Sequence, residues 1–91
     1  MNKERRKELS KAIDELEETK AKIESAMETV EFCKDEEEES YDNLPEGVQD
    51  SERGEAMQEN IDSLDDVISE LESINDSIEE QIDAIQEVID R

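Results

Sequence analysis

Apolar residues recur at alternating steps of four and three over most of this chain. In the second half, one register runs through Met57, Ile61, Leu64, Ile68, Leu71, Asn75, Ile78, Ile82, Ile85 and Ile89. In the first half, another runs through Leu9, Ile13, Leu16, Lys20, Ile23, Met27, Val30, Lys34, Glu37, Tyr41 and Leu44. Such spacing is typical of coiled-coil helices whose seam residues occupy heptad positions a and d. The pattern predicts two helices, over residues 3–39 and 52–90.

The residues between these helices, 40–51, break the register. They contain Pro45 and Gly47, and a proline disfavours helix at the residue before it. Asp50 or Ser51 suits the N-cap of the second helix. We therefore expect a loop that reverses the chain. The predicted fold class is all-α, an antiparallel two-helix hairpin formed by a single domain over residues 1–91.

The apolar stripe is wider than a two-stranded seam requires. Position g, beside the seam, is also apolar at Ala12, Ala26, Cys33, Val67, Ile74 and Val88. A lone hairpin of this size buries little, so we predict a homo-oligomer, with a dimer that forms a four-helix bundle as the first choice. Asn75 would fix the register at some cost in stability. The predicted oligomer seam consists of Ile61, Ile68, Leu71, Asn75, Ile78, Ile82 and Ile85.

Charge changes the picture of what this helical surface can bind. Charged residues make up 45% of the chain and the formal net charge is −21. Such a composition is also found in disordered chains, but disorder gives no reason for a sustained register. Direct binding to nucleic acid or to an anionic membrane requires lysines and arginines, and between Gly54 and Asp90 there are thirteen carboxylates and no base. The expected partner is a basic protein surface.

The carboxylates of the second helix follow the same spacing as the seam, rotated to the outside. A hairpin with arms of about 36 residues would be about 54 Å long. It would carry about one net charge per 2.6 Å, against about one per 1.7 Å in duplex DNA. This density favours a partner-binding acidic face, although an acidic coat that only keeps a coiled coil in solution remains an alternative. The predicted face consists of Glu55, Glu59, Asp62, Asp66, Asp76, Glu80, Asp83, Glu87 and Asp90.

No catalytic constellation is evident. The chain has no histidine and one cysteine, Cys33, which excludes Ser-His-Asp and Cys-His catalysis and histidine-containing metal sites. Glu79-Glu80-x-x-Asp83 with Glu87-x-x-Asp90 resembles the paired acidic motifs of magnesium-dependent nucleotide pyrophosphohydrolases. Those enzymes also need bases for the substrate phosphates, and this segment has none before Arg91. We predict no enzymatic activity, no metal and no cofactor.

Half of the ten bases lie within the first eleven residues, at Lys3, Arg5, Arg6, Lys7 and Lys11. In a hairpin they would pair with Asp83, Glu87 and Asp90. The alternative is a free basic patch that binds a phosphate-bearing ligand. Tyr41 and Arg53 are further candidate ligand or loop contacts.

The single cysteine permits no intrachain disulfide, and no apolar stretch follows Met1, so we expect a cytoplasmic location in the host cell. Two elements around the loop carry a resemblance: Tyr41-Asp42-Asn43-Leu44-Pro45-Glu46-Gly47 and Ser51-Glu52-Arg53-Gly54-Glu55. They resemble small acidic helical proteins encoded by phages and prophages of Gram-positive bacteria. The resemblance implies a phage context, where small acidic proteins often blunt host defences or redirect host enzymes, and it assigns no activity.

Three functions are compatible with these features. The first is an anti-defence inhibitor, a nucleic-acid mimic that occupies the basic surface of a host or defence protein. The second is a sponge that sequesters a small anionic nucleotide signal, using Tyr41, Arg53 or the amino-terminal bases. The third is a structural coiled-coil adaptor.

Overall fold

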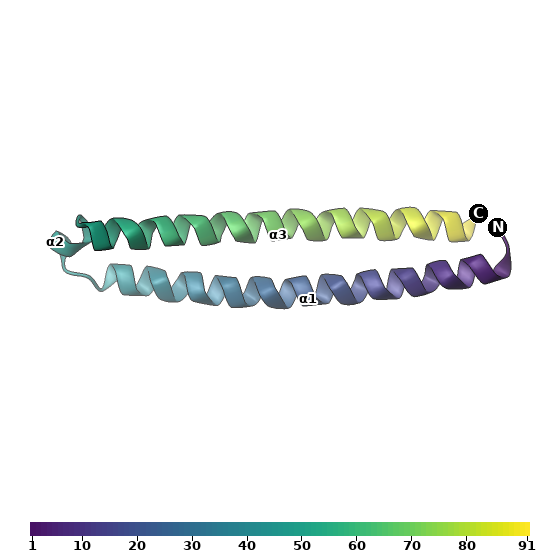
Figure 1. Ribbon diagram of the computed structural model, residues 1–91, viewed down its shortest axis with the longest axis horizontal. Coiled ribbons are helices and arrows are strands. Elements are labelled where there is room, and N and C mark those ends of the chain that lie inside the picture. Colours follow the sequence, from purple (N-terminus) through teal and green to yellow (C-terminus); the bar gives the residue numbers. More distant parts are fainter. The chain divides into compact units, whose positions relative to one another are not determined.

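The protein is all-α. The computed structural model describes all 91 residues and contains helices α1 (Lys3–Asp42), α2 (Glu46–Gln49) and α3 (Glu52–Asp90), with no strand. Figure 1 shows α1 and α3 as the two long helices, with the short α2 between them along the chain. The prediction of an all-α chain built on two long helices that pack together is confirmed.

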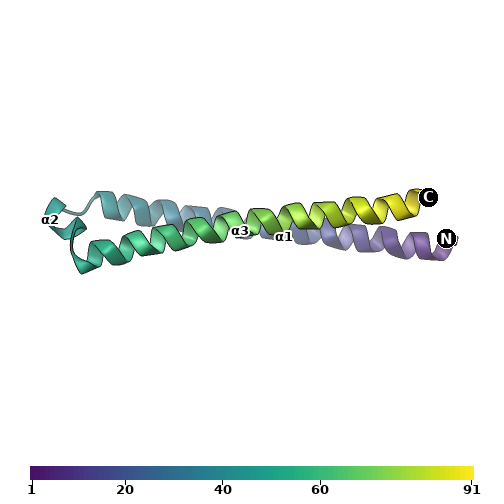
Figure 2. The same ribbon diagram turned by 90° about the horizontal axis from the view of Figure 1, so that it is seen from above.

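The chain divides into two compact units, and each pairs a piece of α1 with a piece of α3. Unit 1 consists of Met1–Ser25 and Glu72–Arg91, and unit 2 is the continuous segment Ala26–Leu71. Within each unit the two helical segments run antiparallel (Figures 1 and 2). Unit 2 also contains α2 and the two connections around it.

In unit 1 the best-buried side chains lie at a positions. Ile13 of α1 and Ile82 of α3 are 8% and 6% exposed, and Asn75 is 8% exposed. The first turn of α1 is capped by Asn2, whose Oδ1 accepts a hydrogen bond from the Arg5 backbone N–H at 2.8 Å. This cap satisfies one of the amide groups that a helix start leaves without a partner.

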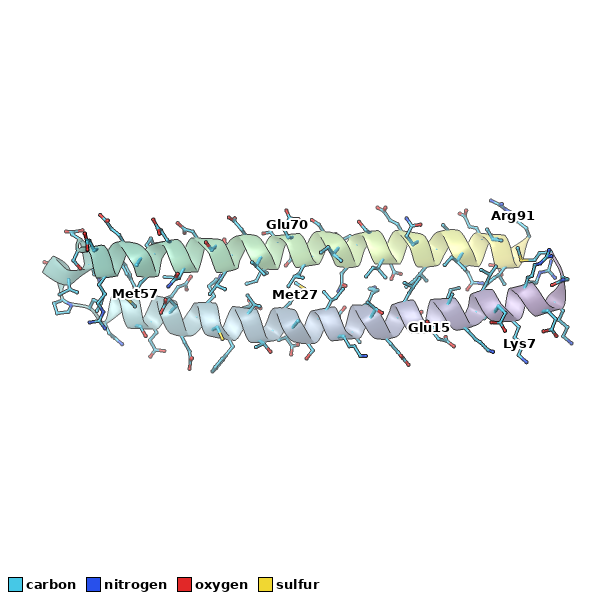
Figure 3. The ribbon with its side chains drawn as sticks, viewed as in Figure 1. Lys7, Glu15, Met27, Met57, Glu70 and Arg91 are labelled. Atoms are coloured by element: carbon cyan, nitrogen blue, oxygen red, sulfur yellow. The ribbon has the colours of Figure 1, made fainter.

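In unit 2 the corresponding buried side chain is Ile61, which is 7% exposed. Met27 and Met57 are directed into the space between the two helices (Figure 3). In both units the a and d positions are buried or half-buried, but no side chain of the chain is fully buried. Two helices alone therefore form a seam and not a closed core.

The connection differs from the predicted loop over residues 40–51. Helix α1 continues to Asp42, and the Asn43 N–H donates to the Glu39 carbonyl at 3.1 Å. Helix α1 does not continue through Leu44 because Pro45 disfavours helix at the residue before it. Residues 46–49 form α2, in which the Pro45 carbonyl accepts from the N–H groups of Val48 and Gln49 at 2.8 and 3.1 Å.

Gln49 fastens this connection to the end of α1. Its side-chain Nε2 donates to the backbone carbonyl of Tyr41, in the last turn of α1, at 3.1 Å and to that of Leu44, beyond the end of the helix, at 3.4 Å. The Ser51 hydroxyl donates to the Val48 carbonyl, so it holds the residue before α3 against the end of α2.

Gly54 lies in the first turn of α3, buried against Gln49. A Cβ atom at Gly54 would lie 2.0 Å from the Gln49 carbonyl oxygen, whereas one at Gly47 would meet nothing within 4 Å. Only glycine at position 54 therefore allows α2 to lie this close to α3.

Neither long helix contains a window apolar enough to cross a membrane.

Candidate interaction surface

The a and d seam gives each unit two flanks of opposite character. At position e, seven of ten residues are acidic: Ser10, Glu17, Glu24, Glu31, Glu38, Gln58, Asp65, Glu72, Glu79 and Gln86. These residues form what we call the acidic flank of each unit. The uncharged flank consists of the g positions that follow the first turns of α1 and α3, where the preceding g positions, Arg5 and Arg53, are basic. Its residues are Ala12, Thr19, Ala26, Cys33, Ser40, Asn60, Val67, Ile74, Gln81 and Val88. Not one of these ten residues carries a charge.

Lysines at seam positions turn their amino groups to the acidic flank. In unit 1, Lys20 Nζ lies 2.5 Å from Glu79 Oε2. In unit 2, Lys34 Nζ lies 3.3 Å from Asp65 Oδ1 and 4.0 Å from Glu38 Oε1. Both lysines thereby place their aliphatic stems on the seam and their charge among carboxylates.

These contacts also shift the titration of the two lysines. The hydrogen bond that Lys20 donates to Glu79 is the main cause that raises the pKa of Lys20 above its ordinary value. The hydrogen bond that Lys34 donates to Asp65 has the same effect on the pKa of Lys34. Each lysine thus stays protonated because its partner stabilises the charged form.

Negative charge is divided unequally between the units. Unit 2 holds 17 acidic residues and two bases, Lys34 and Arg53, which gives it a net charge of −15. Unit 1 holds 14 acidic residues and eight bases, which gives it a net charge of −6. Lys34 is already paired, and Arg53 is exposed and makes no ion pair.

The nine carboxylates predicted to bind a partner are all exposed, and none of them makes an ion pair. Glu55, Glu59, Asp62 and Asp66 belong to unit 2, and the remaining five belong to unit 1. All nine occupy the outer positions b and f. Glu70 is another acid on the side of α3 away from α1 (Figure 3).

The expected pairing of the amino-terminal bases with Asp83, Glu87 and Asp90 is absent. Lys11 instead pairs with Glu8 of its own helix at 3.4 Å. Lys7 and Lys11 occupy the outer positions b and f, and Figure 3 shows Lys7 on the side of α1 away from α3. Since the three acids also occupy outer positions of α3, Lys7 and Lys11 cannot meet them across the seam.

Sequence reasoning missed the acids that α1 adds to unit 2. Exposed carboxylates lie at Glu28, Glu31, Asp35, Glu36 and Glu39. They surround Phe32 along the chain, an outer-face side chain that is 62% exposed. The sequence contains a signal for them, because Lys34 is the only base between Lys22 and Arg53, but the bases of the first eleven residues mask it in the composition of the helix.

The residues predicted to form an oligomer seam face α1 of the same chain. Ile61, Asn75 and Ile82 are buried, and Ile68, Leu71, Ile78 and Ile85 are half-buried. The large apolar side chains of α3 that remain exposed lie beside that seam, on the uncharged flank: Val67 is 42% exposed and Ile74 is 45% exposed.

Asn75 forms a polar layer in unit 1. Its Nδ2 donates to the Lys20 backbone carbonyl at 3.4 Å, while its buried Oδ1 has no hydrogen-bond partner. Such a layer costs stability, since a buried polar atom without a partner loses its hydration.

Two of the open grooves of unit 2 lie beside predicted contact residues. The larger, of about 460 Å³, lies at the uncharged flank and is lined by Cys33, Glu36, Glu37, Ser40, Asn60, Ser63 and Leu64. Asn60 Nδ2 donates to Glu37 Oε2 across it at 2.9 Å. The smaller, of about 230 Å³, is lined by Glu38, Tyr41, Asp42, Gln58 and Ile61. Tyr41 therefore lies beside two carboxylates and no base, which disfavours an anionic ligand there.

The chemistry available to this surface is that of exposed carboxylates. No group of three or more cysteine, aspartate or glutamate side chains is placed to hold a metal ion, and Cys33 is exposed and free. The comparisons with known proteins found no matching family, no matching curated protein and no matching solved structure.

Proposed function

We propose that the protein is a non-enzymatic acidic binding protein whose unit 2 occupies the basic surface of a nucleic-acid-binding protein. The observation that carries this proposal is the charge of unit 2, 17 acidic residues against two bases, of which Lys34 is already paired. The acids are shared almost evenly, 17 in unit 2 and 14 in unit 1, so the difference lies in the bases, two against eight. A coat that served solubility alone would not require bases to be kept out of one unit.

The charge density of unit 2 approaches that of a nucleic acid. Its longer helical segment, Glu52–Leu71, has 20 residues and is therefore about 30 Å long. A net charge of −15 over this length is about one charge per 2 Å, close to the value of about 1.7 Å for duplex DNA. A channel lined with lysine and arginine would be attracted to both by the same long-range field.

The proposed partner is a host or defence protein, because the loop resembles those of small phage and prophage proteins. In that setting the protein would act as a decoy that excludes DNA or RNA from its target. We also propose that two chains pair into a four-helix bundle, since no side chain of one chain is fully buried and Val67 and Ile74 remain exposed.

Two matched variants test the decoy. One replaces four acids of unit 2 with amides (Glu55→Gln, Glu59→Gln, Asp62→Asn, Asp66→Asn). The other does the same in unit 1 (Asp76→Asn, Glu80→Gln, Asp83→Asn, Glu87→Gln). Both remove two aspartates and two glutamates from the same outer positions, so they differ only in the unit that loses charge.

The measurement is capture of partners from the lysate of the producing cell, followed by displacement of labelled DNA or RNA from each captured protein. We expect the unit 2 variant to displace nucleic acid at least about tenfold less well and the unit 1 variant to change by less than about threefold. Raising salt from about 50 to about 500 mM should weaken the wild type steeply. Equal effects of the two variants, or binding that is indifferent to salt, would contradict the proposal.

A further inference from the structure

The uncharged flank stands out against the rest of the surface. Charged residues make up 45% of the chain, yet all ten g positions from Ala12 to Ser40 and from Asn60 to Val88 are neutral. The e positions on the other side of the same seam hold seven acids. An exposed flank has no need to avoid charge, so this neutrality indicates that something covers it.

The two helices contribute different shapes to this flank. In unit 2, α1 presents the small residues Ala26, Cys33 and Ser40, and α3 presents Val67, which is 42% exposed. In unit 1, Ile74 of α3 is 45% exposed. The groove of about 460 Å³ lies between Cys33 and Ser40 on one helix and Asn60 and Leu64 on the other.

We infer that a second copy of this chain covers the uncharged flank. The inference rests on the pairing proposed above and specifies the side through which the chains meet. A copy brings its own net charge of −21, so an approach through the acidic flank or the outer faces of unit 2 sets acids against acids, whereas a basic partner gains nothing from a neutral surface. The distribution of charge therefore favours a second copy as the partner of the uncharged flank and a basic protein as the partner of the acidic surfaces.

The flank is also complementary to itself. In a two-fold pair both chains use the same patch. If residue i of one chain contacts residue j of the other, residue j of the first chain also contacts residue i of the second. The branched side chains of α3 in one copy would then enter the small-residue strip on α1 of the other. Of the two carboxylates at the groove, Glu37 is already held by Asn60, which leaves Glu36 as the acid to be accommodated at its edge.

Two glutamines of α3 provide a matched test within unit 1. Gln81 lies on the uncharged flank and Gln86 lies on the acidic flank, and both are exposed. Gln81→Glu and Gln86→Glu each add one carboxylate to the same stretch of helix. Val67→Glu is the stronger variant, because it places a charge on the exposed apolar residue that α3 contributes to the uncharged flank in unit 2.

The mass of each variant is followed by analytical ultracentrifugation over a range of micromolar concentrations, with helix content checked by circular dichroism. We expect twice the 10.5 kDa chain mass for the wild type. Val67→Glu and Gln81→Glu should weaken association by about tenfold or more, since each added charge appears twice in the pair. Gln86→Glu should change it by less than about threefold.

Cys33 allows a second measurement that needs no destabilising substitution. Its thiol is exposed in the single chain, so a maleimide should react with it in dilute protein and be slowed in concentrated protein. The control is the pair Cys33→Ser with Glu31→Cys, which moves the thiol to the acidic flank, where concentration should make no difference.

A helical wild-type chain that stays monomeric throughout would overturn both the proposed pairing and this inference. A dimer that resists Val67→Glu and Gln81→Glu, or that is broken by Gln86→Glu to the same degree, would overturn the inference alone. Either result would leave the proposed binding of a basic partner to be judged by its own test.

Discussion

The two units share the same a and d seam but differ in how many side chains they bury and in their net charge. Unit 1 buries Ile13, Ile82 and Asn75 and keeps its net charge at −6, with eight bases among its acids. Unit 2 buries one large apolar side chain, Ile61, and carries −15 with two bases. The pieces of α1 and α3 that hold the most repulsion are thus the ones with the least buried apolar surface.

Unit 2 makes up for this in its connection. Gln49 donates hydrogen bonds to the carbonyl of Tyr41 in α1 and to that of Leu44 in the connection, and Gly54 lets the start of α3 lie against Gln49. Unit 1 has no such connection and depends on its seam. In unit 2 the heptad pattern thus carries its acidic surface together with contacts that lie outside the seam.

The largest expected effect comes from breaking that constraint. Gly54→Ala places a Cβ atom 2.0 Å from the Gln49 carbonyl oxygen, so α2 has to move. We expect a loss of about 2–4 kcal/mol in the free energy of unfolding, measured by thermal melts followed by circular dichroism. Hydrogen exchange should show a larger loss of protection in residues 26–71 than in unit 1.

Gly47→Ala is the control for this substitution. A Cβ atom at Gly47 meets nothing within 4 Å, and alanine favours helix over glycine by up to about 1 kcal/mol. The variant should therefore be as stable as the wild type or slightly more stable. If both alanines were equally harmless, the contact between Gln49 and Gly54 would not be what holds unit 2.

The next effect concerns the polar layer of unit 1. Asn75→Ile removes a buried carbonyl oxygen that has no partner and adds an apolar residue at an a position. We expect a gain of about 1–3 kcal/mol in the free energy of unfolding. Asn60→Ile, at an exposed position of unit 2, should give a smaller change. A loss of stability in Asn75→Ile would mean that Asn75 is better satisfied than its contacts indicate.

A smaller effect on stability is expected from salt, and it should differ between the two units because their net charges differ. Screening weakens repulsion between exposed carboxylates, and unit 2 has more than twice the net charge of unit 1. Raising salt from about 20 to about 300 mM should increase hydrogen-exchange protection in unit 2 by about 1 kcal/mol and in unit 1 by less. An increase confined to unit 1 would contradict the comparison.

Sequence alone predicted the seam, because a 4-3 register is a one-dimensional pattern. The a and d positions from Met57 to Ile89 are the ones that the structure buries or half-buries. The connection was harder to predict from the sequence, because α2 has four residues and is too short to show a helical periodicity. The need for Gly54 arises from its approach to Gln49, which no local propensity encodes.

The surface was predictable only in part for a related reason. A count of acids gives the net charge, but the division into −15 and −6 depends on which segments pack together. The expected pairing of the amino-terminal bases failed at Lys7 and Lys11, because proximity along a hairpin does not decide the direction of a side chain. The helical register decides it, and both residues point outward.

The smallest effect compares the two seam lysines, one in each unit. The pKa of Lys20 is raised by Glu79 and that of Lys34 by Asp65. A raised pKa in the folded state means that the stabilisation is complete below the ordinary lysine value of 10.5. It is lost as the pH rises through the higher folded-state value. The melting temperature measured between pH 9 and about 12 should therefore fall at the alkaline end.

Lys20→Arg and Lys34→Arg should each reduce this fall in melting temperature, because arginine keeps its charge at that pH. Lys34 contacts two carboxylates and Lys20 contacts one, so the larger rescue belongs to Lys34→Arg. If neither variant flattened the alkaline limb, the ion pairs would not contribute to either unit.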